Sequence, residues 1–406
     1  MKPEHSHTVI APEGHHTDGQ QLTGMIIALL AGLSAIGILS TNIILPAFPD
    51  IGEQLGVSSR ELGLTLSGFF ITFALAQLVV GPLADRFGRK KLVLGGLSVF
   101  IVGTVVGGLA GSLETLITGR VIQALGVCAA AVLSRAIARD LFTGEKLARA
   151  LSLTMIATAA APGFSPLAGS VLAATLGWRA IFVAVGLAAF AVAVFYASAL
   201  GETHPAERRA PHTIPGVMVA YVKLALNRKF ILPALSVSLL MSGLFASFSA
   251  APAILMEGIG LSSLQTGLYF ASTVFVVFAA GMASPRLAHR YGAQTITVAG
   301  ILTALSGGGL LLTGSSAPGL GWYTLSMVMF LWGMGLANPL CTAITMGPFG
   351  HQAGLASALL GFLSMGAAAV TTWLASVLVF PAVISLGVIQ AVACLISLLL
   401  FLLRRK

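Results

Sequence analysis

The chain has 406 residues, of which 57% are hydrophobic and only 9% are charged, whereas soluble domains average about 25% charged residues. A soluble protein of this composition would lack the polar surface to cover itself, so we exclude a soluble fold. The formal net charge of +9 does not indicate nucleic-acid binding, because the basic residues form short clusters between apolar runs rather than one basic face.

The apolar runs predict the membrane-spanning elements. A transmembrane helix needs about 20 apolar residues, and twelve runs reach that length. In chain order the predicted spans are 22–46, 62–82, 92–111, 114–138, 147–173, 178–200, 229–252, 263–284, 293–313, 321–345, 353–378 and 380–403. We therefore expect an all-α membrane protein with twelve transmembrane helices in two six-helix halves.

Two polar segments lie outside these spans. Residues 1–21 form a polar tail with no apolar core before Leu22, so they do not resemble a secretory signal. Residues 201–228 form the longest internal polar segment and contain three prolines, as is typical of a stiff linker. We expect this linker to join an N-terminal half, 22–200, to a C-terminal half, 229–406.

The basic residues predict how the chain is oriented. Nineteen of the 22 Lys and Arg residues lie on one side of the predicted spans, whereas Arg60 and Arg179 lie on the other and Arg120 falls inside a span. Cytoplasmic loops are enriched in Lys and Arg. We therefore expect the tail, the linker and both termini to be cytoplasmic.

A sequence repeat relates the two halves. The segment 83–96 recurs as 287–300, an offset of 204 residues, and both copies contain Leu-Ala-x-Arg-aromatic-Gly after the second span of their half. The second copy has His289 where the first has Asp85. Parallel repeats of six helices are a transporter architecture, so the repeat favours transport.

The fourth predicted span contains an ionisable residue, Arg120, about two turns from its start. Charged residues inside a membrane are costly and are candidates for functional sites. Gln123 follows three positions later and projects from the same helix face. We expect both side chains to line the translocation pathway; the alternative is that Arg120 reaches to the outer membrane surface.

Two other spans contain candidate residues. In the fifth span, prolines remove backbone hydrogen bonds and bend the helix, and glycines permit close packing. We expect this helix to rock against its neighbour. The alternative is a passive kink. Phe245 and Phe248 on the seventh span, with Asn338 on the tenth, are candidates for the lining of a substrate cavity, the alternative being packing against lipid or core. The bending residues are Pro162, Gly163, Pro166 and Gly169.

Several motifs resemble a known family. The segment 81–91, Gly-Pro-Leu-Ala-Asp-Arg-Phe-Gly-Arg-Lys-Lys, looks like the loop signature of the major facilitator superfamily. The segments 45–51, 120–126 and 139–142 resemble its bicyclomycin-resistance branch of drug:proton antiporters, and 161–169 resembles the fifth-helix motif of drug exporters. The chain departs from these patterns in three places. Ser165 and Ser170 stand where glycine is usual, the second loop copy has His289 in place of the acid, and Asn42 replaces the usual first-helix aspartate.

The resemblance implies a secondary transporter in a bacterial inner membrane, a monomer that exports a drug or metabolite by alternating access with protons as coupling ion. An uptake permease or facilitator on the same scaffold is one alternative, and a non-transporting receptor is another. In similar proteins the loop after the second helix holds one conformation shut, and an acid in it can lie at the start of the eleventh helix. In this chain that gating loop comprises Gly81, Asp85, Arg86, Gly88 and Arg89; the alternative is a positively charged anchor that only fixes topology.

The sequence lacks the patterns of other activities. It has no nucleophile–base pair, no metal-ligand cluster within a helix and no phosphate-binding loop. We therefore expect no enzymatic activity, no cofactor, no metal and no nucleic-acid partner. The expected partners are a small-molecule substrate, the lipid bilayer and protons.

The first-helix substitution bears on energy coupling. In similar proteins the aspartate at the position of Asn42 is a candidate proton carrier, and an amide does not titrate in the relevant range. None of the 13 acids lies deep inside a predicted span. We hypothesise that Asn42 lines the cavity close to Arg120 and hydrogen-bonds substrate. Proton coupling would then use an acid near a membrane face, such as Asp50, Glu114 or Asp140, or a proton carried by the substrate.

Overall fold

The computed structural model describes residues 24–205, 207, 214–314 and 319–404, so the predicted tail at 1–21 lies outside it. Within these ranges every regular element is helical, and twelve helical segments are long and apolar enough to cross a membrane. The all-α, twelve-span membrane fold expected from the apolar runs is therefore confirmed.

The N-terminal half is built from six spans. The first combines α1 (Gly24–Asn42), the short 3-10 turn η1 (Leu45–Ala47) and α2 (Phe48–Leu55). The other five are α3 (Ser59–Phe87), α4 (Arg89–Gly108), α5 (Leu113–Leu141), α6 (Gly144–Leu176) and α7 (Arg179–Ala199).

The C-terminal half begins after α8 (Ile214–Ala225), which lies within the predicted linker. Its spans are α9 (Arg228–Ala251) with its π-helical extension η3 (Pro252–Gly258), α10 (Ser263–Tyr291), α11 (Ala293–Thr313), α12 (Leu320–Met346) with the turn η4 (Gly347–Gln352), α13 (Ala353–Val377) and α14 (Ala382–Leu403).

The first span runs farther than the predicted 22–46. Pro46 and Pro49 interrupt the helix, since each lacks a backbone N–H, but each occupies one of the first two positions of a new helical segment, where that N–H is not needed. The chain therefore continues as η1 and α2 to Leu55 instead of ending at the prolines.

The internal repeat extends over a whole helix. Helices α3 and α10 have 29 residues each and start 204 positions apart. Both begin with a capping box, formed by Ser58 with Glu61 and by Ser262 with Gln265, in which each side chain bonds the other residue's backbone N–H. The two halves thus share local start signals as well as the loop motif.

The same helices end in the same way. Gly88 and Gly292 have φ values of 93° and 87°, and each is followed directly by the next helix. A side chain is strained at such positive φ values, so glycine allows the sharp reversal between α3 and α4 and between α10 and α11. This explains why the glycine of the repeated motif occurs in both copies.

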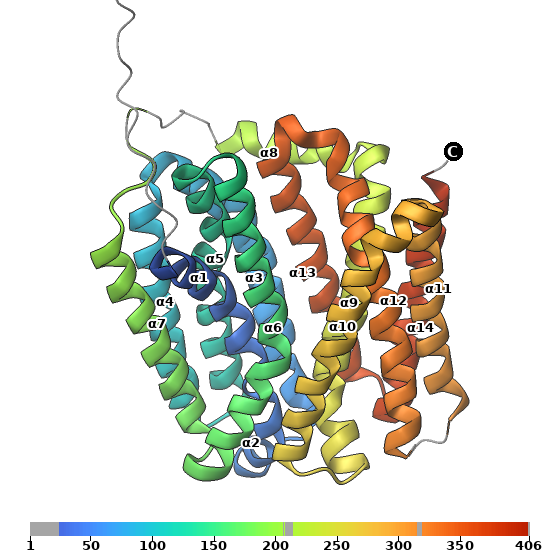
Figure 1. Cartoon of the computed structure of the whole chain (residues 1–406). Coiled ribbons are helices and arrows are strands. Elements are labelled where there is room, and N and C mark those ends of the chain that lie inside the picture. The colour runs from blue at the N-terminus through green and yellow to red at the C-terminus, as the bar shows by residue number, and fades with distance from the viewer. Residues whose placement is uncertain (1–23, 206, 208–213, 315–318, 405–406) are drawn as a thin grey trace, which may run out of the picture.

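The two bundles stand side by side (Figure 1), with α3 packed against α13 and α6 packed against α10 across their interface. We call the end that carries α8 and the α3–α4 turn the linker face. We call the opposite end, which carries α2 and the α13–α14 turn, the far face. The interface between the bundles leads from one face to the other and contains the candidate site.

Candidate functional site

Hydrogen bonds join the two halves at the far face. Arg60 at the start of α3 donates to the backbone carbonyl oxygens of Leu378, at 2.6 Å, and Phe380, at 2.5 Å, in the α13–α14 turn. Ser263 at the start of α10 donates to the carbonyl oxygen of Pro46 at 3.0 Å. The far face is therefore closed by polar contacts between the halves.

Farther along α3 toward the linker face, small and polar residues meet the C-terminal half. The hydroxyls of Ser67 and Thr372 lie 2.9 Å apart. Gly63 faces the hydroxyls of Ser249 and Ser376 so closely that a Cβ atom would collide with both. The close approach of the halves thus depends on the absence of a side chain at Gly63.

Phe245 and Phe248, which we predicted as lining residues, belong to an aromatic cluster at the centre of the interface. The ring of Phe245 lies 4.7 Å from Phe70 of the other half and 6.3 Å from Phe248. Phe248 in turn lies 5.6 Å from Phe270. Together with Tyr269 and neighbours, Phe248 also lines a small cavity of about 70 Å³. The cluster fills the interface between the far face and the linker face.

A much larger cavity, of about 830 Å³, lies at the linker face among α3, α5, α8 and α13. Ligand pockets typically measure about 300–1,000 Å³, so its size suits a small organic molecule. Its polar lining residues are Gln77, Asp85, Arg89, Arg135, Arg139, Tyr221, Gln352 and Ser357. The described conformation thus has a closed far face and a cavity at the linker face.

Arg120 is buried in the N-terminal half with only 1% of its surface exposed. One guanidinium nitrogen donates to the carbonyl oxygen of Ser40 at 2.9 Å and to Gln123 at 2.8 Å, and the guanidinium lies 4.7 Å from the ring centre of Phe69. Gln123 donates in turn to the hydroxyl of Thr104 at 2.8 Å. Arg120 therefore links α1, α3 and α5 and does not reach toward the outer membrane surface.

Asn42 is equally buried, at 1% exposure, and donates to the carbonyl oxygen of Ile38 at 3.1 Å. Its side-chain oxygen and two guanidinium nitrogens of Arg120 have no hydrogen-bond partner among the described residues. Buried polar atoms without partners are costly, and they need explanation in a native structure. Asn42 and Arg120 share no hydrogen bond, although Arg120 bonds Ser40, two residues from Asn42.

The six predicted lining residues therefore do not form one site. Asn42, Arg120 and Gln123 lie together inside the N-terminal half but line neither of the two cavities described above. Phe245 and Phe248 lie at the interface, where Phe248 lines the smaller cavity. Asn338 is half-buried on α12 and lines neither cavity.

The prolines and glycines of the fifth span lie where α6 crosses its neighbours. α6 remains one helix across Pro162 and Pro166. Gly163 packs against Val274 of α10, and Gly169 packs against the backbone of Ile43. Glycine at these positions allows close helix contact. Gly163 therefore sits at the interface between the halves, where a rocking helix would need it, whereas Gly169 packs within the N-terminal half.

The serine that replaces the usual glycine at position 170 faces a glycine on the other side of this crossing. A Cβ atom at Gly267 of α10 would lie 2.8 Å from the hydroxyl oxygen of Ser170, and Ser170 is fully buried. The added side-chain volume on α6 is thus accommodated by a residue without a side chain on α10.

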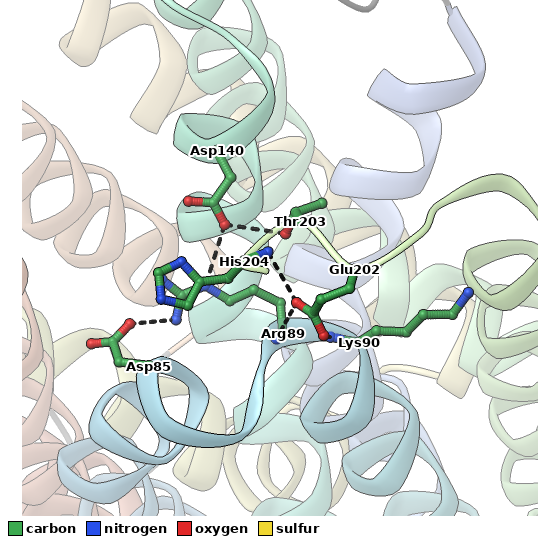
Figure 2. Close-up of polar contacts among 7 residues, drawn as sticks. All are labelled: Asp85, Arg89, Lys90, Asp140, Glu202, Thr203 and His204. Carbon is green, nitrogen blue, oxygen red and sulfur yellow. Dashed lines mark hydrogen bonds and ion pairs between the residues drawn. The ribbon is translucent and has the colours of Figure 1, made fainter. Parts of the chain in front are cut away.

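The gating loop forms an ionic network at the linker face (Figure 2). Asp85 pairs with Arg89 at 2.6 Å, and Arg89 also pairs with Asp140 of α5 at 3.3 Å. Asp140 accepts a second hydrogen bond, of 3.1 Å, from Thr203. In this conformation Asp85 therefore pairs within its own loop, and α13 has no side-chain cap at its start.

Glu202 completes the network from the segment after α7. Its carboxylate accepts hydrogen bonds from the backbone N–H groups of Arg89, at 2.7 Å, and Lys90, at 3.2 Å, at the start of α4 (Figure 2). A carboxylate is favourable there because the helix dipole is positive at its N-terminus. Of the other loop residues, Arg86 is exposed and stacks on Phe87.

Comparisons with known proteins agree with this architecture. A family model described as Major Facilitator Superfamily matches residues 30–372. Multidrug resistance protein D of Escherichia coli (strain K12) is 28% identical over 93% of this chain and 95% of its own length. The uncharacterized MFS-type transporter YdgK of Bacillus subtilis is 30% identical over 86% of this chain and 88% of its own length. The bicyclomycin resistance protein homolog of Haemophilus influenzae is 27% identical over the same shares, 86% of this chain and 88% of its own length.

Solved structures show the same fold at lower identity. A bacterial homolog of the human lysosomal transporter Spinster, in an inward-facing and occupied conformation, gives a TM-score of 0.74 at 17% identity, covering 94% of this chain and 96% of its own. The structure of a D-xylose-proton symporter gives a TM-score of 0.70 at 17% identity, covering 92% of this chain and 96% of its own.

Proposed function

The chain belongs to the major facilitator superfamily of membrane transporters, and we propose that within it the chain is an efflux permease that exports a drug or metabolite by alternating access. The observation that carries this proposal is the similarity, over nearly the whole chain, to proteins named for multidrug and bicyclomycin resistance. The fifth-helix motif at the α6–α10 crossing supports it further.

We assign the linker face to the cytoplasm of a bacterium and place the chain in its inner membrane. Nineteen of the 22 basic residues belong to this side in the predicted topology, as cytoplasmic loops require. The conformation described above is then open to the cytoplasm and closed to the outside, which is the state in which an exporter loads its substrate.

We propose that the two halves rock as rigid bodies around the α3–α13 and α6–α10 contacts. Opening outward breaks the bonds of Arg60 and Ser263 at the far face. Closing inward brings the gating loop toward the start of α13, where Asp85 exchanges Arg89 for the uncapped helix end. A single chain supplies both halves, so the transporter acts as a monomer.

Proton coupling has a candidate in the gating network. Among the acids near a membrane face, Asp140 bonds Arg89 of the gating loop, so its protonation would weaken the hold on that loop. Asn42 does not titrate. Its side-chain oxygen has no hydrogen-bond partner among the described residues, and we assign it to substrate contact during the part of the cycle in which it becomes accessible.

A growth-inhibition panel tests the export proposal. An efflux-deficient bacterium carries the gene, an empty vector or the Asp85→Asn variant at matched membrane abundance. We expect the wild-type gene alone to raise resistance to at least one compound. Sensitisation by the wild-type gene would instead support the uptake permease, and no change for any compound or in vesicle transport would support a non-transporting receptor.

A further inference from the structure

Two arginines of the linker-face cavity have no hydrogen-bond or ion-pair partner within the part of the chain that the structure describes. Arg135 and Arg139 lie one turn apart on α5, and both are exposed and line the 830 Å³ cavity. Neither forms a hydrogen bond or ion pair with any described residue. Like charges four positions apart on a helix repel each other, so an anion between them would relieve an unfavourable arrangement.

The carboxylates near the cavity are already paired. Asp85, the acid in the cavity lining, is bound to Arg89. Asp140, next to Arg139 in sequence, is bound to Arg89 and Thr203. Burial and the nearby Asp85 carboxylate raise the pKa of Tyr221 to about 12, so the tyrosine in the lining adds no negative charge at neutral pH. The cavity lining therefore carries an excess of positive charge.

The opposite side of the cavity is also favourable for an anion. α13 begins there with Ala353 and Gly354, and no side chain caps this helix end. Backbone N–H groups at a helix start carry partial positive charge and point toward an incoming anion. The walls between the two sides are apolar and include Val132, Leu133 and Leu355.

We propose that this cavity binds an amphipathic organic anion, and that Arg135 and Arg139 hold its carboxylate, sulfonate or phosphate group. Guanidinium groups pair with such groups through two parallel hydrogen bonds, and the apolar walls accept the rest of the molecule. The proposal rests on the export function, because it makes the anion the cytoplasmic substrate. Arg120 is not the recruiting charge, since it is buried and lines neither cavity.

Binding to the purified full-length chain tests this assignment. Calorimetry in phosphatidylcholine nanodiscs compares naphthalene-2-sulfonate with the neutral naphthalene-2-sulfonamide. We expect the sulfonate to bind more tightly than the sulfonamide to the wild-type chain. Arg135→Gln with Arg139→Gln should weaken sulfonate binding by about tenfold or more and leave sulfonamide binding unchanged.

The chain offers a matched control. Arg286 and Arg290 are likewise one turn apart, on α10, are exposed and lie outside the cavity lining. Replacing both with Gln changes the net charge equally and should leave sulfonate binding unchanged. Arg135→Lys with Arg139→Lys keeps the charge and should retain partial sulfonate binding. This pair shows whether the Gln variant loses binding through loss of charge or through misfolding.

Three outcomes would overturn the proposal. The first is equal binding of sulfonate and sulfonamide, and the second is an equal loss of sulfonate binding in the Arg135/Arg139 and Arg286/Arg290 Gln variants. The third is loss of sulfonate binding when phosphatidylglycerol replaces phosphatidylcholine, which would assign the arginines to a lipid headgroup. The export function fails separately. If the growth panel reveals export but the wild-type chain binds sulfonate and sulfonamide equally, export stands and the anion site falls. If sulfonate binds at the arginines but no compound is exported, the site stands and export falls.

Discussion

Arg60 donates a 2.6 Å hydrogen bond to the carbonyl oxygen of Leu378, the residue that caps the C-terminal end of α13. The bond crosses from the N-terminal to the C-terminal half at the far face. A cation is favourable at this helix end, because the helix dipole is negative there. The contact therefore stabilises the closed far face with a charge as well as with a hydrogen bond.

We predict that Arg60→Ala shifts the transporter toward a state with an open far face. A charge-assisted hydrogen bond contributes roughly 1.5–3 kcal/mol, so the open population should rise by about ten- to a hundredfold. Ser376 lies at the closed interface, so the variant Ser376→Cys reports on opening. The rate at which an impermeant maleimide labels this cysteine from the far side measures the open population. Arg179→Ala is the control, since Arg179 bonds Gln54 within its own half. Equal labelling in both variants would contradict the prediction.

We predict that Asp85→Asn strongly reduces transport while the protein still inserts. The variant loses the ion pair with Arg89. In the second conformation proposed above, it also loses the charge at the start of α13. Transport per unit of protein in the membrane is the measurement. His289→Asn, at the equivalent position of the second repeat, should leave transport near wild type. Unchanged transport in Asp85→Asn would leave the loop only its role in topology.

We predict that Arg120→Ala abolishes transport and that Arg120→Lys restores it in part. Lysine keeps the charge but loses the planar set of donors that contacts Ser40 and Gln123. Thermal unfolding of each purified variant separates a loss of function from a loss of fold. Wild-type transport by the alanine variant would refute a role for this buried charge.

We predict that Asn42→Asp makes transport depend more steeply on the pH gradient. A carboxylate at this position can bind and release a proton during the cycle, whereas the amide of Asn42 cannot. Transport in vesicles at several pH gradients measures the change. If the wild type couples fully to the gradient and the variant has the same rate and pH profile, the assignment of Asn42 is wrong.

The sequence predicts the spans and their repeat well, because both depend on local patterns. Runs of apolar residues identify membrane helices, and the glycines at 88 and 292 identify equivalent turns. The helix α8 was not expected, since twelve residues are too few to cross a membrane and the surrounding segment is polar.

The candidate site could be predicted only in part, because contacts between distant helices depend on their relative rotation and depth. Arg120 stood out as a charge within a span, but its burial against Ser40 and Phe69 did not follow from spacing. The bonds from Arg60 to the α13–α14 turn span more than 300 residues of sequence, and no local pattern indicates them. Arg135 and Arg139 likewise looked like ordinary cytoplasmic charges until the cavity placed them together.

Transport into inside-out membrane vesicles is the most direct test of export. The compound is one against which the wild-type gene raises resistance in the growth panel, and vesicles with equal amounts of the Asp85→Asn variant serve as the control. We predict that energised wild-type vesicles accumulate the compound above its external concentration and that the control vesicles do not. Accumulation in right-side-out vesicles alone, or none in either orientation, would contradict the assignment of this chain as an exporter.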